Sequence, residues 1–323
     1  MPRRVRVGVI GTGALGYHHA RLYRQLPGAE LVGVHDHHPG RGEHVAAELG
    51  TVAFPSIDAL LDKVEAVSVV VPTKGHEEVG LAVLSRGVAA LIEKPLAATL
   101  PAAERLVRAA AEHRAILQVG HVERFNRAVR AAVPYLDEPR FLQCDRLAPF
   151  QPRGTDVAVV LDLMIHDLDL ILELVGAEVT EVRATGAPLL TPHVDIANAR
   201  VEFANGAVAV VTASRISRER TRRLRLFQPT GYFSLDLAQG SGHFYQLKEG
   251  WQDLGASKIE DIVRHVKLSA PQAEPLQLEL ESFLNAVRGD GDVVVSGASG
   301  LRALALAFRV ADAIQASPIA SRP

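Results

Sequence analysis

Short apolar runs alternate with amphipathic stretches over the first 120 residues of the chain. The runs are rich in β-branched residues and predict strands at Val5–Ile10, Glu30–His35, Thr51–Phe54, Ala66–Val71, Ala89–Ile92 and Ile116–Val119. Between several of these runs, apolar residues recur at helical spacing, in Leu15–Leu26, Gly75–Arg86 and Pro101–His113. Strands that alternate with helices are typical of an α/β fold with an open, doubly wound parallel sheet.

The pattern changes after Gly120. The apolar segment Val157–Val175 predicts a helix, and a long region of alternating apolar and polar residues follows it. The strands expected there are Val179–Gly186, Ile196–Phe203, Ala207–Arg215, Arg222–Gln228 and Tyr232–Leu237, and helical spacing returns at Leu276–Arg288 and Gly300–Ala316. We therefore expect two domains, residues 1–122 and 123–323. The second is an α+β domain with a large, mostly antiparallel open sheet, and its last helix can pack back on the first domain.

The composition favours a globular protein that acts on a small molecule. Of the 323 residues, 48% are apolar and 22% are charged, which is not the balance of a disordered chain. Lys plus Arg number 35 and Asp plus Glu 37, so no overall field favours nucleic acid or an anionic membrane as a partner. Cys144 is the only cysteine, which excludes an intrachain disulfide and a cysteine-based zinc site. No apolar run reaches the length of about 18 residues that a membrane span needs, and we expect a cytoplasmic protein.

A glycine-rich turn, Gly11-Thr12-Gly13-Ala14-Leu15-Gly16, follows the first predicted strand and opens a helix. In a dinucleotide-binding fold the first glycine makes the tight turn, the second admits the pyrophosphate, and the third lets the helix pack on the strand. The pyrophosphate would then meet free amide groups at the helix N-terminus. A purely structural glycine turn is the alternative.

Asp36 decides between the two cofactors that such a turn can bind. It ends the second predicted strand, 20 residues after Gly16, where a carboxylate can accept hydrogen bonds from the adenosine ribose. The same charge would repel a 2′-phosphate, so we expect NAD in preference to NADP. His37, His38 and Arg41 lie in the same corner; they leave NADP use open, but a solvated basic loop is the favoured interpretation.

Two further groups of residues suggest catalytic chemistry. Glu93-Lys94-Pro95 follows a buried strand at the carboxyl edge of the sheet, where a lysine can donate a charged hydrogen bond to a substrate; an ordinary surface ion pair is the alternative. In Val157–Val175, polar residues recur at spacings of four, three and four and share one helix face: Asp162, His166, Asp169 and Glu173. That stripe fits a solvated face, a metal site, or a general acid/base in which Asp162 orients His166.

Four motifs together resemble a known family. They are Gly11-x-Gly13-x-x-Gly16, Pro72-Thr73 with His76, Glu93-Lys94-Pro95 and Asp162-x-x-x-His166, and they look like those of the glucose–fructose oxidoreductase, inositol dehydrogenase and rhizopine catabolism (Gfo/Idh/MocA) family. The resemblance runs over nearly the whole chain. It implies an N-terminal Rossmann domain that binds NAD, a substrate-binding second domain, and oxidation of a secondary alcohol, usually on a sugar, nucleotide sugar or cyclitol. It also implies a homodimer or homotetramer formed through the exposed face of the second domain's sheet.

The resemblance assigns roles to individual residues. Lys94, Asp162 and His166 match the family's catalytic lysine, aspartate and histidine: His166 would remove the hydroxyl proton while Lys94 hydrogen-bonds the forming carbonyl oxygen, and Asp162 would position one of them. The expected cofactor-binding residues are Gly11, Thr12, Gly13, Ala14, Leu15, Gly16, Asp36, His37, Pro72, Thr73, His76, Glu93 and Lys94. We expect no metal ion.

Residues 120–126 and 162–169 look most like the subgroup that oxidises the 3-hydroxyl of UDP-N-acetylglucosamine. Arginines that could bind a diphosphate are Arg124, Arg127, Arg153 and Arg215, and Asn126 could bind a sugar hydroxyl or acetamido group. The expected substrate-binding residues are His121, Glu123, Arg124, Asn126, Arg153 and Asp169. Each arginine alone, and the basic run Arg215–Arg223, also fits a solvated charge, with contact to an anionic substrate as the alternative for that run.

Two other functions stay open at this point. One is a dehydrogenase of a free sugar or inositol. The other is a regulatory protein that senses NAD without catalysis, against which the presence of Lys94, Asp162 and His166 argues.

Overall fold

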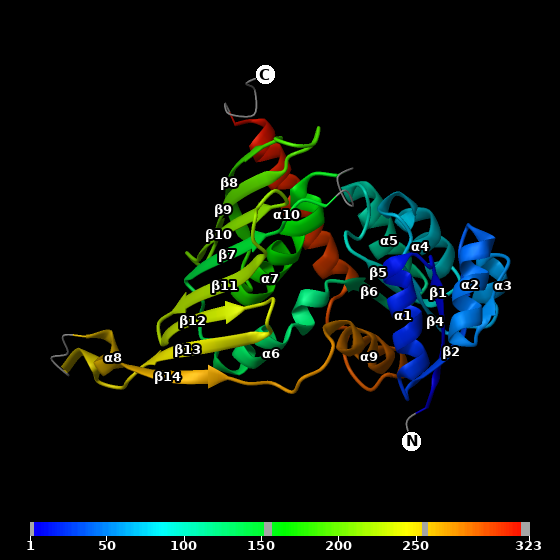
Figure 1. Ribbon diagram of the computed structural model, residues 1–323, viewed down its shortest axis with the longest axis horizontal. Helices are drawn as coiled ribbons and strands as arrows, with labels where there is room; N and C mark the ends of the chain where they lie inside the picture. Colours follow the sequence, from blue (N-terminus) through cyan, green and yellow to red (C-terminus); the bar gives the residue numbers. More distant parts are fainter. Residues whose placement is uncertain (1–2, 152–156, 254–257, 318–323) are drawn as a thin grey trace. The chain divides into compact units, whose positions relative to one another are not determined.

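The computed structural model describes residues 3–151, 157–253 and 258–317, and the chain divides into two compact units (Figure 1). The first unit comprises Met1–Val122 with Glu274–Leu304, and the second comprises Glu123–Ala273 with Ala305–Pro323. Residues Glu274–Leu304 thus extend the first unit beyond the range 1–122 that was expected from the sequence.

A parallel sheet forms the centre of the first unit, in the strand order β3-β2-β1-β4-β5-β6. Its strands are β1 (Val5–Ile10), β2 (Ala29–His35), β3 (Val52–Ala53), β4 (Ala66–Val69), β5 (Ala89–Glu93) and β6 (Leu117–Gly120). The order reverses between β1 and β4, which confirms the predicted doubly wound sheet. The helices described in this unit are α1 (Ala14–Gln25), α2 (Pro39–Leu49), α3 (Ile57–Leu61), α4 (His76–Leu84), α5 (Leu100–Glu112) and α9 (Pro275–Arg288).

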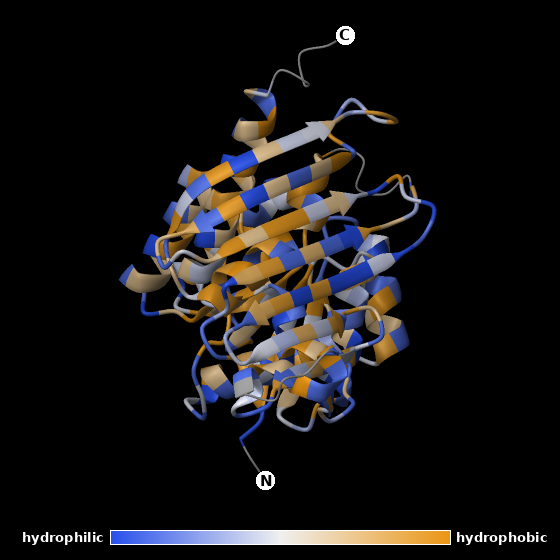
Figure 2. Ribbon diagram, turned by 90° about the vertical axis from the view of Figure 1, so that its left-hand side faces the viewer, coloured by the Kyte–Doolittle hydropathy of each residue, from blue (hydrophilic) through white to orange (hydrophobic). Residues whose placement is uncertain are grey.

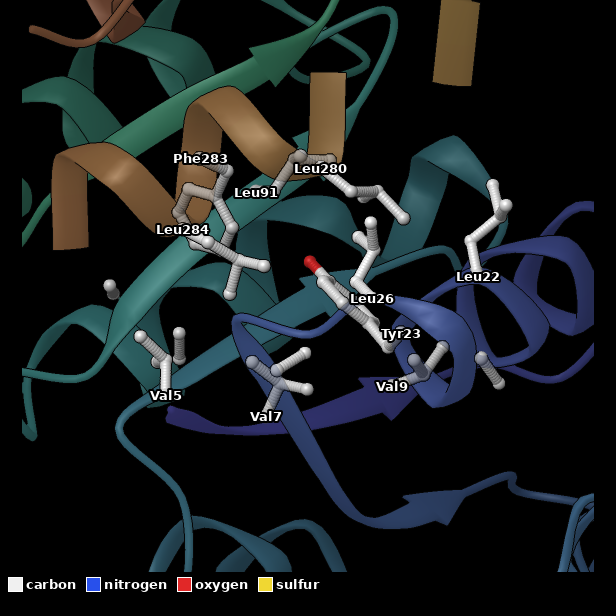
Figure 3. Packing of buried hydrophobic residues seen from close by; sticks show 14 of the residues in the cluster. Val5, Val7, Val9, Leu22, Tyr23, Leu26, Leu91, Leu280, Phe283 and Leu284 are labelled. Carbon is white, nitrogen blue, oxygen red and sulfur yellow. The ribbon is translucent and has the colours of Figure 1, made fainter. Parts of the chain in front are cut away.

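The late helix α9 packs into the core of the first unit. Leu280, Phe283 and Leu284 on its inner face are at most 1% exposed, and they join a cluster with β1 and α1 (Figure 3). Burying side chains of this size stabilises the fold by about 1.5–3 kcal/mol each. The helix begins after Glu274, whose carboxylate accepts two hydrogen bonds of 3.1 Å from Arg21 of α1. Apolar packing and this ion pair therefore fix a segment from the end of the chain onto the N-terminal sheet.

The second unit is built on a larger sheet, in the order β14-β13-β12-β11-β7-β10-β9-β8. Its strands are β7 (Phe141–Leu147), β8 (Val179–Ala187), β9 (Ile196–Phe203), β10 (Val208–Ser214), β11 (Thr221–Gln228), β12 (Gly231–Asp236), β13 (Ser241–Leu247) and β14 (Val263–Leu268). Only β7 and β10 pair in parallel among these strands, so the prediction of a mostly antiparallel sheet is confirmed. The sequence reading missed β7, β13 and β14.

Helices cover one face of this sheet. They are α6 (Arg127–Ala132), the π-helical turn η4 (Val160–Met164), α7 (Ile165–Val175) and the second-unit part of α10 (Gly297–Gln315), while the short α8 (Ile259–Ile262) precedes β14. Figure 2 looks onto the opposite face. No helix within the described residues is both long and apolar enough to cross a membrane.

A ladder of aromatic side chains crosses the uncovered face. Its members, one on each of β7, β11, β12, β13 and β14, are paired directly across neighbouring strands: Phe141, Phe227, Tyr232, Tyr245 and His265. Their ring centroids lie 6.0, 5.3, 4.7 and 5.0 Å apart in that order. Such cross-strand aromatic pairs stabilise a sheet, but Phe141 and Phe227 remain 37% and 39% exposed.

Candidate functional site

The glycine turn between β1 and α1 has the geometry that a dinucleotide requires. Gly11 has φ +90, a left-handed conformation that favours glycine, and a Cβ on Gly16 would lie 1.9 Å from the carbonyl oxygen of Gly11. A Cβ on Gly13 would meet no atom within 4 Å, so the space above this residue is open. Gly13 is also the N-cap of α1 and offers no side chain to the first amide groups of the helix, which leaves them for an anion. The turn therefore fits the pyrophosphate of a dinucleotide.

The carboxylate of Asp36 is fixed against this turn. Its Oδ2 accepts hydrogen bonds from the amide (2.7 Å) and hydroxyl (2.9 Å) of Thr12, and its Oδ1 accepts one from the amide of His38 at 2.9 Å. Burial works to raise the pKa of Asp36, but these hydrogen bonds, helped by Arg41 at 3.8 Å, outweigh burial and hold the pKa below its usual value. His37 is exposed beside it, at 3.4 Å. The residue thus presents an ionised carboxylate where a ribose would bind.

Lys94 follows β5, and the residue before it is buried. The Glu93 carboxylate contacts Nε2 of His19 at 3.1 Å, and it accepts a hydrogen bond from the Lys94 amide at 3.2 Å. Burial works to raise the pKa of Glu93, but His19 and Lys94 outweigh it and lower the pKa. Glu93 therefore holds the backbone from which the half-buried Lys94 side chain projects, and the Lys94-Pro95 peptide is cis. The sequence reading missed His19, although it lies one helical turn after Gly16.

His76 ties the start of α4 to the same segment. Its Nδ1 lies 2.9 Å from the carbonyl oxygen of Pro95, and its Nε2 lies 2.9 Å from that of Val71. Both ring nitrogens are thus engaged by the backbone, and the side chain is 1% exposed. Pro72 is exposed and Thr73 is half-buried in the turn η1 (Thr73–Gly75). Of these three predicted cofactor-binding residues, His76 is placed to position the others.

Asp162 and His166 belong to the second unit and lie where the predicted helix begins. Asp162 is in the π-helical turn η4, His166 is in the first turn of α7, and both side chains are half-buried. A π-helical turn inside a helix is rare and is found frequently at functional sites. The spacing of four residues predicted a continuous α-helix, and it could not reveal this wider turn.

Other acidic residues of the predicted stripe are structural. Asp169 is 1% exposed and accepts two hydrogen bonds from Arg124, of 2.6 and 2.9 Å, so the interpretation as a solvated face is wrong for this residue. Glu173 pairs with the same guanidinium. Burial works to lower the pKa of Arg124, but Asp169 and Glu173 outweigh it and raise the pKa. Within the described residues, no three His, Cys, Asp or Glu side chains gather as a metal site.

A second buried ion pair anchors the other side of the helix. Arg146 of β7 donates two hydrogen bonds, of 2.7 and 2.8 Å, to the neighbouring Asp167, and a third of 2.9 Å to Glu123. The other oxygen of Glu123 accepts a hydrogen bond from Asn126, at 2.9 Å. Asn126 also donates to the carbonyl of Leu237 and caps α6. Glu123 and Asn126, which we expected to bind substrate, thus have protein partners.

Two expected substrate-binding residues remain. His121 is fully buried in the first unit, directly after β6. Arg153 lies outside the described residues.

A pocket of about 160 Å³ in the second unit includes Asp162. It is lined by Arg146, Leu147, Ala148, Pro149, Gln151, Asp162, Leu163, Arg215, Arg220 and Arg222. Arg146 was not among the expected site residues, and Arg220 and Arg222 were considered only as part of the basic run Arg215–Arg223. The alternation along β11 could have indicated Arg222, since it lies on the same face as the buried Leu224 and Leu226.

Comparison with known proteins agrees with this geometry. Residues 5–121 match the model of an oxidoreductase family with an NAD-binding Rossmann fold, and residues 136–234 match the GFO/IDH/MocA C-terminal domain. A UDP-N-acetylglucosamine 3-dehydrogenase of Acidithiobacillus ferrooxidans is 41% identical over 97% of this chain and 98% of its own. A solved structure of that enzyme has a TM-score of 0.89, with 97% and 98% of the two chains covered. A scyllo-inositol 2-dehydrogenase (NAD(+)) of Bacillus subtilis is 34% identical over 67% of this chain and 69% of its own.

These matches confirm three predictions made from the sequence. The cofactor is NAD, which the first unit binds through its Rossmann fold. The protein is a dehydrogenase that acts on CH–OH groups. The resemblance to the family is also confirmed, and the chain belongs to the Gfo/Idh/MocA family of oxidoreductases.

Proposed function

We propose that this protein oxidises the 3-hydroxyl group of UDP-N-acetylglucosamine with NAD as the oxidant. The observation that carries the proposal is the 41% identity, over nearly the full length of both chains, to an enzyme of that name. The inositol dehydrogenases are less similar and share a smaller part of the chain. Asp162 and several arginines line one pocket, which supports an anionic substrate over a neutral cyclitol.

Three residues divide the chemistry in this proposal. NAD, when bound, accepts the hydride from the alcohol carbon. His166 takes the hydroxyl proton, a role to which an imidazole side chain is suited. Lys94 donates a hydrogen bond to the same oxygen as it becomes a carbonyl, and Glu93 holds the Lys94 backbone in place. Asp162 positions the proton-transfer groups from its π-helical turn.

A substrate panel tests the proposal. Purified protein is mixed with NAD and, in turn, UDP-N-acetylglucosamine, free N-acetylglucosamine, myo-inositol and scyllo-inositol, and the formation of reduced cofactor is followed by absorbance. We expect turnover with the nucleotide sugar and none with the cyclitols. Turnover of an inositol, with none of the UDP-sugar, would replace the proposal by the second candidate, an inositol dehydrogenase.

One variant separates an enzyme from a cofactor sensor. Lys94→Ala should still bind NAD and lose turnover by about a thousandfold, because the hydrogen bond to the reacting oxygen is removed. Normal turnover by the Lys94→Ala variant would show that Lys94 is not a catalytic residue.

We also propose that the chain forms a homodimer or homotetramer through the uncovered face of the large sheet. The aromatic ladder supports this, since Phe141 and Phe227 remain exposed at the end of a row of stacked rings. Light scattering of the wild type and of Phe227→Asp tests it. We expect the wild type to have the mass of two or four chains and the variant to have a lower mass. A monomeric wild type would refute the proposal.

A further inference from the structure

The pocket around Asp162 is formed where several elements of the second unit end or begin. Leu147 ends β7 and Ser214 ends the parallel strand β10, and the two strands are paired up to these residues. Beyond them, the amide of Ala148 donates to the carbonyl of Ser214 at 2.8 Å, and the amide of Ser217 donates to that of Ala148 at 3.0 Å. These hydrogen-bonded segments lie on one side of the pocket, and the π-helical turn that contains Asp162 forms another side.

Two of the four arginines in this lining are already committed to the fold. Arg146 is bound to Asp167 and Glu123. Arg215 is 5% exposed, donates to the carbonyl of Val157 at 2.6 Å, and lies 3.9 Å from the Asp195 carboxylate. These two guanidinium groups therefore have structural partners and form part of the pocket wall.

The other two arginines supply charge that the protein neutralises only in part. Arg222 has two acidic neighbours, Glu123 at 3.6 Å and Asp167, and both carboxylates already accept hydrogen bonds from Arg146. Arg220 is exposed and makes no ion pair within the part of the chain that the structure describes. Burial and the charges of Arg146 and Arg220 lower the pKa of Arg222. The positive charge of Arg222 therefore lies in a place where neighbouring positive charges repel it.

The direction of the side chains shows that this charge is not an ordinary solvated face. Along β11, Arg222 alternates with Arg223, and Leu224 and Leu226 on the Arg222 side are at most 2% exposed. Arg222 therefore points to the helix-covered side of the sheet, into the pocket with Asp162, whereas Arg223 is exposed on the opposite face.

We infer that Arg220 and Arg222 bind the diphosphate group of the substrate in this pocket. Two guanidinium groups match the charge of a diphosphate, and each can donate paired hydrogen bonds to phosphate oxygens. The pocket is smaller than the roughly 300–1,000 Å³ of sites for complete drug-sized ligands, so it suits one group of a nucleotide sugar rather than the whole molecule. The inference rests on the proposed function for the identity of the anion as part of a nucleotide sugar.

Binding measurements without catalysis test this subsite. Calorimetric titration with UDP and with uridine compares the wild type with Arg220→Ala, Arg222→Gln and the control Arg218→Ala, which removes an exposed arginine of the same loop outside the pocket lining. We expect the dissociation constant of UDP to rise about tenfold or more in the first two variants, because each loses a charged hydrogen bond. The constants for uridine and NAD, and all constants of Arg218→Ala, should stay within about twofold.

Kinetics separate this inference from the proposed function. The KM for UDP-N-acetylglucosamine should rise in Arg220→Ala more than kcat falls. Turnover of the UDP-sugar with an unchanged KM in both pocket variants would overturn the subsite and leave the proposed function intact. Binding of UDP that depends on both arginines, in a wild type that does not oxidise the UDP-sugar, would support the subsite and refute the proposed function. Equal binding of UDP by all four proteins would overturn the subsite.

Discussion

Replacement of Asp195 by asparagine should destabilise the second unit in a way that depends on pH. This carboxylate is fully buried, and its Oδ2 accepts hydrogen bonds from the amides of Leu189, Leu190 and Thr191, of 2.8, 2.7 and 2.9 Å. Its Oδ1 accepts a further bond from the Thr191 hydroxyl at 2.8 Å. The backbone carbonyl of Asp195 accepts a hydrogen bond from the amide of Arg215. The segment around Asp195 therefore also fixes Arg215, which forms part of the wall of the pocket described above.

The pKa of Asp195 gives the magnitude. Burial works to raise this pKa, but the hydrogen bonds from Leu190, Leu189 and Thr191 outweigh it and lower the pKa from 3.8 to about 2. A pKa unit corresponds to about 1.4 kcal/mol, so the ionised carboxylate stabilises the fold by about 2 kcal/mol at neutral pH. Because the folded pKa is the lower one, this contribution is complete above the unfolded value and is lost as the pH falls toward the folded value. About half of it should remain at pH 3.

Urea unfolding, followed by circular dichroism, measures this difference. At pH 7 the free energy of unfolding of Asp195→Asn should be lower than that of the wild type by about 1–2 kcal/mol, because the amide keeps one acceptor and loses the charge. The difference should shrink as the pH falls from 5 to 3. A difference that stays constant over this range would refute the reasoning, since it would show that shape and not ionisation accounts for the effect. Asp292→Asn, an exposed acidic residue, is the control and should change little.

Three further predictions concern the cofactor site and the helix that carries Asp162. Gly13→Ala should keep its thermal unfolding midpoint and bind NAD about tenfold more weakly, because the new methyl group occupies the open space where the pyrophosphate would bind. Gly16→Ala, in contrast, should be destabilised, because its methyl group would clash with a backbone oxygen. Calorimetry of both variants checks this, and equal NAD binding by Gly13→Ala and the wild type would contradict it. Asp36→Asn should lower the ratio of kcat/KM for NAD to that for NADP by about tenfold, since the charge that repels a 2′-phosphate is gone; an unchanged ratio in paired assays would contradict it. Asp169→Asn should reduce the free energy of unfolding by about 1.5–3 kcal/mol, because it removes the bidentate partner of the buried Arg124 and leaves Glu173 to compensate the charge; a loss below about 1 kcal/mol in urea would count against this pairing.

The first unit was predictable because its signals are local. Each strand of its parallel sheet is a short run of buried apolar residues, and β1 and β4 read as strands from composition alone. In the second unit, β7 was missed because a charged residue, Arg146, occupies an inward-facing position of the strand. Its partner Asp167 lies 21 residues away on α7, and no local pattern reports such a pairing. In β13 and β14 the alternation is concealed, because the polar Gln246 and Arg264 lie on the same side as the buried Phe244, whereas Tyr245 lies on the uncovered face.

The same difference, between local signals and pairings of distant residues, explains which site residues could be predicted from the sequence. Motifs that act through the backbone, such as the turn at Gly11–Gly16, carry their geometry in their spacing. The roles of arginines do not, because a guanidinium group that binds a ligand and one that holds a helix have the same sequence signature. Arg124 is a candidate for the diphosphate from the sequence, yet Asp169 and Glu173 already neutralise it, whereas Arg222 shares the carboxylate of Glu123 with Arg146 and Arg220 is exposed.

The polar residues of α7 therefore have two separate tasks. Asp167 and Asp169 are buried and bind arginines from other segments, so they fix the rotation of the helix about its axis. That rotation leaves Asp162 and His166 half-buried at the start of the helix, with Asp162 in the wall of the cationic pocket. The paired acids position the helix, and the two remaining groups are placed for chemistry. One short segment of the sequence, residues 162–169, thus contains both the attachment of the helix and its proposed catalytic end.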